Sequence, residues 1–419
     1  MFRSRVLLLL PLLALSGALL AQETVTPPPP PETLTKEVKE EVLAAIEEVI
    51  TKRAFVPGVE LSKWPEFLAK QREAVDKAEK DTEFARAVNT ALRDFGISHI
   101  RFLAPRTAQA RTRTSAIGVG LNARAEKEGL VVTMIFPKSP AEEAGIKAGE
   151  TIVEVEGKLP DSMAVLNGDE GTTVAVKVKD KEGMIRELKL PRKTYSVVRE
   201  DTLTWPNEET AVLKIHSFSR GYSQKGIEKL MEEASKAKYL VLDLRSNGGG
   251  ATNNLQHLLS MLLPPDTIIG TFISRSTSEA FAKANEGRIE NDPLVLAKEA
   301  KNRYRTREGK VPYFKGKIAV LINRGSASAS EICAAALKEH VSATIVGSRS
   351  AGAVLASVFR KLPQGYEVQY PVSDYVTNAG VRLEKNPVVP DEVVTEPAAD
   401  GKDPVLEKAM EKLKGAGGG

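Results

Sequence analysis

The chain has 419 residues, which is enough for two or three domains that each bury a core of their own. Hydrophobic residues make up 42% of it and charged residues 27%, as is typical of a globular protein. Lys and Arg number 59 against 55 for Asp and Glu, and no basic stripe is interleaved with aromatic residues. This balance argues against nucleic acid as a partner.

The N-terminus has the order of a secretory signal peptide. Arg3 and Arg5 precede an apolar run over residues 6–15, and small residues follow. Ala18 or Ala21 is the expected last residue of the removed segment. An uncleaved anchor helix is the alternative, but the apolar run is short for a bilayer span. We therefore expect an exported protein, periplasmic or extracytoplasmic, with no membrane span after cleavage.

The chain has a single cysteine, Cys333, so no intramolecular disulfide is possible. We expect this residue to be a small buried side chain on a helix rather than a reactive thiol. No cluster of His, Cys and carboxylates has metal-ligand spacing, so neither a metal nor an organic cofactor is expected.

After a proline run at 27–31, the segment 34–94 shows helical periodicity. Its apolar residues recur at four-residue spacing with charged residues between them, as on the buried face of a helix. They include Val38, Val42, Ile46 and Ile50. The pattern predicts a small helical domain.

From about residue 116 the pattern changes to short strands. A short loop of Gly118, Val119, Gly120 and Leu121 is followed by a strand, a short helix and further strands up to about residue 178. This order resembles a PDZ domain. In such domains the apolar-Gly-apolar loop offers backbone N–H groups to the C-terminal carboxylate of a peptide, which adds as a strand to the sheet edge. A PDZ-like fold used only for packing is the alternative.

From about residue 210 buried strands and helices alternate, which predicts an α/β core with a largely parallel central sheet. The expected strands are 212–215, 239–244, 318–322 and 343–346, and the expected helices are 224–236, 253–262 and 328–339. The stretch 276–314 is charged and weakly patterned, so we expect an insertion or a mobile surface there. A short helix is expected over 403–414.

Two motifs in this core point to acyl transfer. The run Gly325-Ser326-Ala327-Ser328-Ala329-Ser330-Glu331 directly follows a buried strand and opens a helix. Such a corner exposes a serine, and the helix N-terminus favours developing negative charge. The second motif, Asp243-Leu244-Arg245-Ser246-Asn247-Gly248-Gly249-Gly250, ends a strand in three glycines and lacks the Gly-Lys-Ser/Thr ending of a phosphate loop. Its backbone N–H groups favour an oxyanion hole.

Together these motifs resemble the S41 serine peptidases, which include C-terminal processing proteases and tricorn core proteases. The resemblance covers nearly the whole mature chain and implies a multidomain α/β protein with a ClpP/crotonase-like catalytic core. By this resemblance Ser328 is the nucleophile, and Ala329 with Gly248 or Gly249 supplies the oxyanion N–H groups. Ser326 and Ser330 are then structural neighbours of the nucleophile.

The chain departs from this family in one respect. Processing proteases use a Ser–Lys dyad, and Ala353 stands where that lysine is expected. The tricorn-like branch uses a histidine instead, and Ser98 and His99 match its position at the end of the helical segment, with Glu384 matching the glutamate that orients the histidine. A neutral histidine abstracts a proton near neutral pH.

The resemblance therefore implies a serine endopeptidase that cuts unstructured or C-terminally exposed polypeptides, with PDZ-assisted binding. A catalytically inactive PDZ-bearing binding protein is the first alternative, because Ala353 replaces the lysine. An enzyme that uses Lys361 as its base is the second.

The predicted organisation divides the chain into six parts. They are a signal peptide (1–21), a Pro-rich linker (22–33), a helical domain (34–112), a PDZ domain (113–195), an S41 peptidase core (196–398) and a C-terminal helix with its tail (399–419).

Overall fold

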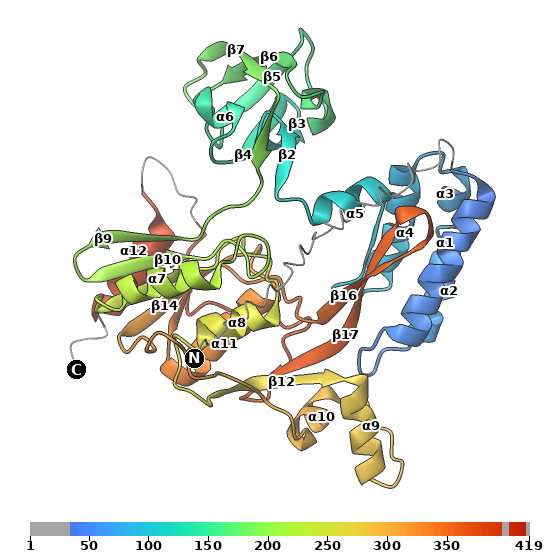
Figure 1. The fold of residues 1–419 in the computed structure, drawn as a ribbon, viewed down its shortest axis with the longest axis vertical. Coiled ribbons are helices and arrows are strands. Elements are labelled where there is room, and N and C mark those ends of the chain that lie inside the picture. The colour runs from blue at the N-terminus through green and yellow to red at the C-terminus, as the bar shows by residue number, and fades with distance from the viewer. Residues whose placement is uncertain (1–33, 396–401, 416–419) are drawn as a thin grey trace, which may run out of the picture.

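The computed structural model describes residues 34–395 and 402–415. Figure 1 shows helices at the N-terminal end, a β-rich unit and a larger α/β part. The predicted signal peptide (1–21) and the Pro-rich linker (22–33) fall outside the described residues. Mixed helices and sheets agree with the predicted α/β, multidomain fold class.

The N-terminal helices have the periodicity that the sequence predicts. They are α1 (Lys36–Glu48), which continues as a π-helical turn (Val49–Arg53), α2 (Trp64–Ala69), α3 (Arg72–Lys77) and α4 (Asp81–Asp94). Thr35 caps the N-terminus of α1, because its side chain accepts the Val38 N–H. Their core also takes in Tyr366 and Val368 from far along the chain. The helices are therefore packed onto the α/β part.

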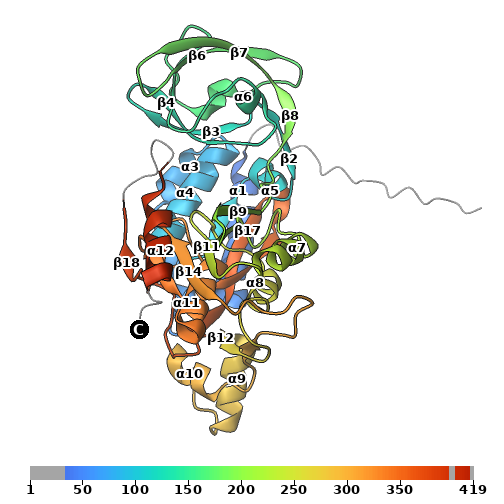
Figure 2. The same ribbon diagram turned by 90° about the vertical axis from the view of Figure 1, so that its left-hand side faces the viewer.

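The β-rich unit (residues 121–191) is an antiparallel sheet with a core of its own. Its strands, in spatial order, are β3 (Leu121–Glu126), β4 (Gly129–Ile135), β5 (Thr151–Val155), β6 (Thr173–Lys179) and β7 (Ile185–Pro191). The short helix α6 (Pro140–Glu143) follows β4. Two connecting strands, β2 (Ser115–Gly118) and β8 (Lys193–Ser196), pair antiparallel and lead back to the rest of the molecule, as Figure 2 shows.

The core sheet has six strands and is parallel except at one edge, as the sequence predicts. In spatial order these are β18 (Glu392–Val393), β15 (Thr344–Gly347), β14 (Lys317–Ile322), β11 (Tyr239–Asp243), β10 (Thr210–Lys214) and the antiparallel β9 (Thr202–Asn207). Every residue of β11 is buried, because a parallel sheet is covered on both faces.

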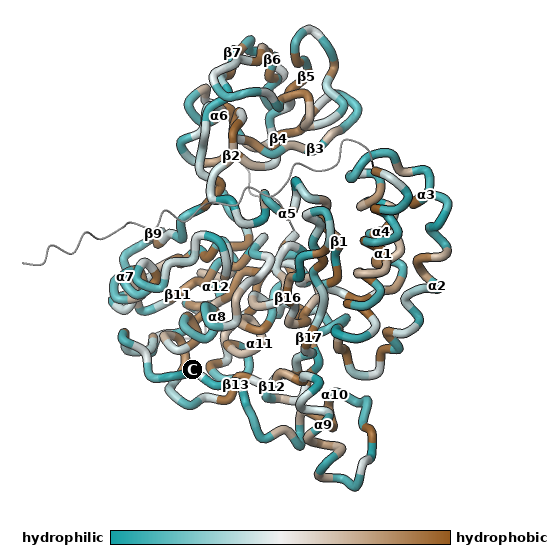
Figure 3. Tube along the Cα trace, turned by 45° about the vertical axis from the view of Figure 1, so that its right-hand side comes forward, coloured by the Kyte–Doolittle hydropathy of each residue, from teal (hydrophilic) through white to brown (hydrophobic). Residues whose placement is uncertain are grey.

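Helices cover both faces of this sheet. One face packs against α7 (Gln224–Ala234), α8 (Thr252–Leu259) and α11 (Ala329–Val341). The other packs against Val405, Ala409 and Leu413 of the C-terminal helix α12 (Pro404–Gly415). In Figure 3 the outward turns of α3 and α7 are hydrophilic, whereas hydrophobic residues gather where α11 meets the strands. Cys333 is fully buried in α11, and burial raises the pKa of its thiol, as expected for a packing residue.

A second sheet joins the helical part to the core. Its long strand β17 (Glu367–Thr377) pairs with three other strands, and a fourth strand pairs with β12 (Ile268–Ser274) at the edge of the sheet. The others are β1 (Arg101–Leu103), β12, β16 (Ala356–Lys361) and the edge strand β13 (Tyr304–Arg305). The sequence patterns did not predict this sheet.

Residues 276–314, where we expected an insertion or a mobile surface, contain helices that the sequence patterns did not predict. These are α9 (Arg275–Ala284) and α10 (Pro293–Glu299), which pack through Phe281 and Leu296 against β12 and β17. The start of α10 carried a local signal, because the N-cap residue Asp292 is followed by Pro293. The buried faces are short, so charged residues dominate the pattern.

Candidate active site

Ser328 occupies a sharp corner between β14 and α11. We call residues 323–328 the serine corner. Ser328 has φ 56° and ψ −118°, a combination that is strained for a residue with a side chain. Its N–H donates to the Ala353 carbonyl at 2.9 Å and to Glu331 Oε2 at 3.0 Å. The strained conformation is thus held by hydrogen bonds from two directions.

Glu331 anchors this corner to the loop that follows β15. Its side chain is fully buried and accepts hydrogen bonds from Ser350 Oγ at 2.5 Å, the Gly352 N–H at 2.7 Å and the Ala353 N–H at 3.0 Å, besides that of Ser328. The sequence patterns assigned no role to Glu331. A glutamate three residues after the first serine of a helix is a capping-box position, and this signal was available.

The glycine loop (residues 244–250) leaves the adjacent strand β11 and packs against the serine corner. Asn247 is fully buried and donates to the Ile215 carbonyl at 2.9 Å, while its backbone carbonyl accepts from Ala327 N–H at 3.1 Å and Ser330 Oγ at 2.8 Å. Ser326 Oγ donates to the Leu244 carbonyl at 2.9 Å. Ser326 and Ser330 therefore fasten the two loops together.

The glycines allow the closest approach to Ser328. A Cβ on Gly249 would lie 2.8 Å from that of Ser328, which no other residue could accommodate without movement. The Gly249 N–H donates to Asn247 Oδ1 at 2.9 Å. Within the described residues the N–H groups of Gly248 and Ala329 have no hydrogen-bond partner.

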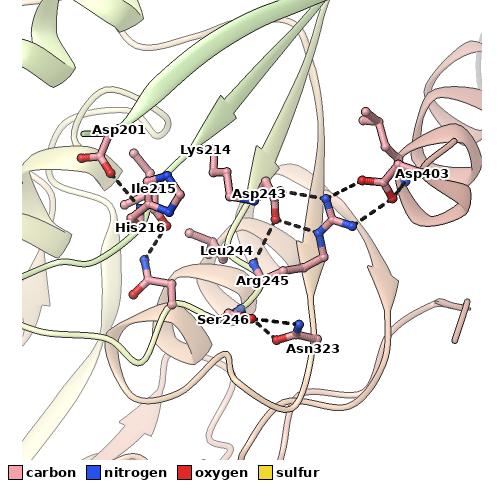
Figure 4. Close-up of polar contacts among 12 residues, drawn as sticks. Asp201, Lys214, Ile215, His216, Asp243, Leu244, Arg245, Ser246, Asn323 and Asp403 are labelled. Carbon is pink, nitrogen blue, oxygen red and sulfur yellow. Dashed lines mark hydrogen bonds and ion pairs between the residues drawn. The ribbon is translucent and has the colours of Figure 1, made fainter. Parts of the chain in front are cut away.

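A charged network holds the start of the glycine loop, as Figure 4 shows. The nearly buried Asp243 accepts from Arg245 Nε at 2.9 Å and pairs with Lys214 at 3.1 Å. Burial alone would raise the pKa of Asp243, but the hydrogen bonds and charge of Arg245 lower it. Arg245 also pairs at 2.7 Å with Asp403, which directly precedes α12, and Ser246 N–H donates to Asn323 Oδ1 at 2.8 Å.

His99 lies at the end of the N-terminal helical segment beside two of its expected partners. Its Nδ1 is 2.9 Å from Ser98 Oγ, and Ser98 Oγ donates to Glu384 Oε2 at 2.8 Å. The nearly buried Glu384 also accepts the Val354 N–H at 2.9 Å and the Ser98 N–H at 3.3 Å. Burial lowers the pKa of His99, although the charge of Glu384 opposes this shift. His99 is therefore neutral at neutral pH.

His99 and Ser328 line one cavity of about 660 Å³. Gly248, Gly249 and Ala329 line it as well. Besides polar residues such as Arg111 and Gln369, larger apolar side chains line it, namely Phe272, Ile332, Val354, Leu355, Val358, Phe359 and Val372. The structure thus brings a serine, a neutral histidine and unpaired N–H groups to a common space.

Other predicted residues lie elsewhere. Ser98 and Glu384 stand behind His99 and do not line the cavity, and neither do Ala353 and Lys361. The loop from Gly118 to Leu121 joins β2 to the edge strand β3 of the β-rich unit, also outside the cavity. Its Val119 and Gly120 carbonyls accept N–H groups of Ala141 and Phe136 at 2.8 and 2.9 Å.

Two further properties concern cofactors and membranes. In residues 34–395 and 402–415, no three His, Cys, Asp or Glu side chains are grouped so that they could hold a metal ion. Over the same residues no helix is both long and apolar enough to cross a bilayer.

Known proteins resemble this chain in sequence. Residues 209–394 match the model of peptidase family S41. The chain is 29% identical over 290 residues to a carboxyl-terminal-processing protease of Picosynechococcus sp., covering 67% of this chain and 64% of that one. It is also 29% identical over 278 residues to the tail-specific protease of Haemophilus influenzae, covering 61% and 36%. The chain thus spans less than two thirds of the length of these relatives.

Solved structures share the fold. The photosystem II D1 C-terminal processing protease has a TM-score of 0.51 and 24% identity, covering 91% of this chain and 98% of that one. The tricorn protease also has a TM-score of 0.51, with 17% identity, covering 90% of this chain and 37% of that one. With the match over residues 209–394, the α/β core carrying the serine corner and the glycine loop is a domain of peptidase family S41.

Proposed function

We propose that this protein is an exported serine endopeptidase that hydrolyses unstructured or C-terminally exposed polypeptides. The observation that carries the proposal is the single cavity lined by Ser328, a neutral His99 and the N–H groups of Gly248 and Ala329. The names of the relatives, carboxyl-terminal-processing and tail-specific proteases, support the same substrate class.

The reaction follows from the roles of these groups. His99 takes the Ser328 hydroxyl proton as the oxygen attacks the scissile carbonyl, and then gives the proton to the leaving amine. Water hydrolyses the resulting acyl-enzyme with His99 again as base, which releases the acid and regenerates Ser328. Ser98 and Glu384 hold His99 in one orientation through its Nδ1.

The oxyanion that forms in each step needs two N–H donors. Of the two glycines that the sequence left open, we favour Gly248 with Ala329, because the Gly249 N–H already donates to Asn247. Gly249 then serves the close approach of the two loops.

Two parts of the proposal rest on other evidence. Export, to the periplasm or another extracytoplasmic space, rests on the charged, apolar and small-residue order of residues 3–21. PDZ-assisted binding rests on the loop from Gly118 to Leu121 at the start of edge strand β3, since an edge strand has unpaired backbone groups for an added peptide.

A measurement of turnover distinguishes this proposal from the alternative, a catalytically inactive binding protein in which Ala353 replaces the lysine. Purified protein lacking residues 1–21 is incubated with casein and with a peptide library, beside Ser328→Ala, His99→Ala and Lys361→Ala variants. We expect cleavage by the wild type and by Lys361→Ala alone. Equal inertness of wild type and Ser328→Ala across a broad pH range would show a binding protein, and loss of cleavage in Lys361→Ala would make that lysine the base.

A further inference from the structure

A second hollow of about 390 Å³ adjoins the proposed active-site cavity. The two share Arg111, Ser219 and Phe359 in their linings, so they lie side by side. The remaining lining residues of the second hollow are Val197, Arg199, His216, Ser217 and Arg220. We call this space the arginine hollow. A polypeptide that lies in the active-site cavity is therefore next to this hollow.

The arginine hollow is built from segments that meet at the glycine loop. Arg111 ends α5 (Pro105–Arg111) before β2, and Arg199 follows β8, so each comes from one connection to the β-rich unit. Arg220, on the loop between β10 and α7, donates to the Arg111 carbonyl. The Phe218 N–H on that loop donates to the Gly249 carbonyl at 3.0 Å. The hollow is thus fixed relative to the oxyanion donors.

Gly221 explains how these segments come so close. It has φ 91°, and a Cβ there would lie 2.9 Å from the Arg199 carbonyl oxygen. Only glycine suits both the conformation and the approach. The position of Arg199 beside the loop is therefore set by packing rather than by a flexible side chain alone.

The charge of the hollow is positive and largely uncompensated. Arg111 pairs with Glu367 at 2.9 Å and stacks 3.8 Å from the Phe359 ring. Within the described residues, Arg199 and Arg220 form no ion pair with a carboxylate, and no carboxylate lines either cavity. His216 adds no charge at neutral pH, because burial and neighbouring cations lower its pKa to about 4.

Besides Glu367, Asp201 is a carboxylate next to the hollow, because it contacts the lining residue His216. It accepts the His216 N–H at 2.7 Å and does not line the hollow. Burial raises the pKa of Asp201 to about 6. The charge of Arg199 opposes this shift, but among the described residues Asp201 forms no ion pair with Arg199 or Arg220, so both guanidinium groups can still bind an incoming anion.

We propose that the arginine hollow is a subsite that binds a carboxylate of the polypeptide in the active-site cavity. Guanidinium groups bind carboxylates through paired, charge-assisted hydrogen bonds. The carboxylate belongs either to an acidic side chain near the scissile bond or to the C-terminus of the chain being cut. The proposal rests on the peptidase function proposed above, and it adds a preference for substrates with negative charge at a fixed distance from the cleavage site.

A binding measurement on Ser328→Ala protein tests the subsite without turnover. The probes are fluorescein-labelled ten-residue alanine–serine peptides of three kinds. One carries a single glutamate at successive positions with an amidated C-terminus, one has glutamine with a free C-terminal carboxylate, and one has glutamine with an amidated C-terminus. We expect at least one carboxylate peptide to bind about tenfold more tightly than the uncharged one, which corresponds to about 1.4 kcal/mol. The kind that gains affinity identifies the source of the carboxylate.

Arg199 is the position to change, because its side chain forms no hydrogen bond with residues 34–395 or 402–415 that the change would remove. Arg199→Gln should bind all peptides within about twofold of one another, whereas Arg199→Lys should keep part of the preference and salt should weaken it. Arg349→Gln, an exposed arginine that lines a different cavity, should keep the full preference. Equal binding of all peptides, or a preference that survives in Arg199→Gln, would overturn the proposal. Since the protein tested lacks the nucleophile, these outcomes are independent of whether the wild type cleaves peptides.

Discussion

The two sides of the proposed active site are assembled in different ways. On the serine side, the corner and the glycine loop leave the neighbouring parallel strands β14 and β11, and Glu331 follows Ser328 by only three residues. On the histidine side, Ser98 and Glu384 are 286 residues apart in the chain. The serine side is built from contiguous motifs at the ends of neighbouring strands, and Ser328 in it is strained. The histidine side exists only once the tertiary fold has formed.

The two sides nevertheless meet at one short stretch of backbone. Glu331 accepts the Ala353 N–H, and Glu384 accepts the N–H of the next residue, Val354. Two nearly buried carboxylates thus fix consecutive peptide groups, one tied to the nucleophile and the other to its base. Ala353, which stands where the family resemblance places a lysine, contributes backbone groups to this link through its N–H and its carbonyl.

The largest expected effect is a loss of turnover when the nucleophile or its base is removed. Ser328→Ala and His99→Ala should each lower kcat by about 10⁴-fold or more, because nucleophile and base act as a unit. The double variant should then lose no more than either single one. Steady-state kinetics on one cleaved peptide measure all three, and additive losses would mean that His99 acts independently of Ser328.

The next largest effect is a loss of stability, which we expect when Glu331 on the serine side is changed. Glu331→Ala leaves buried N–H donors without an acceptor, so the free energy of unfolding should fall by about 3 kcal/mol or more. Urea unfolding followed by circular dichroism measures it. Glu339→Ala on the same helix, which loses one 3.2 Å hydrogen bond to the Ala379 N–H, should cost less than about 1 kcal/mol. Equal losses would contradict the anchoring role of Glu331.

The same contrast decides what the sequence could predict. The serine corner and the glycine loop are contiguous motifs at strand ends, so their residue types alone indicated acyl transfer. The parallel sheet was equally predictable, because strands such as β11 are apolar throughout. Ser98 and Glu384 required the family resemblance, since no local pattern links residues so far apart.

Several features had no readable signal. Strand β17 pairs with strands as far apart in the chain as those of Arg101 and Ser274, and periodicity does not predict which strands pair. The arginine hollow likewise draws on four separate segments, which no local pattern links. By contrast, the capping position of Glu331 and the N-cap of α10 were local signals that the patterns around them obscured.

A smaller effect is expected from the long-range side. Glu384→Gln removes the charge that orients His99 through Ser98 without removing the base itself, so kcat/KM should fall by about 100-fold, as for a modest misplacement of a catalytic group. Ser98→Ala should cost a similar factor, and the two changes combined should cost little more. A loss as large as that of His99→Ala would mean that Glu384 does more than position the histidine.

The smallest effect is a shift in pH dependence, and it tests the base most directly. The acid limb of kcat/KM reports the pKa of the free enzyme's base. Burial lowers the pKa of His99 from its ordinary value of 6.5, so the protein should keep half of its activity at a pH below that value. The negative charge of Glu384 raises the same pKa, and Glu384→Gln should therefore move the limb to still lower pH while lowering the plateau. A glutamate that only packs against His99 would lower the plateau and leave the midpoint unchanged, and a midpoint that moves upward would exclude His99 as the group that titrates.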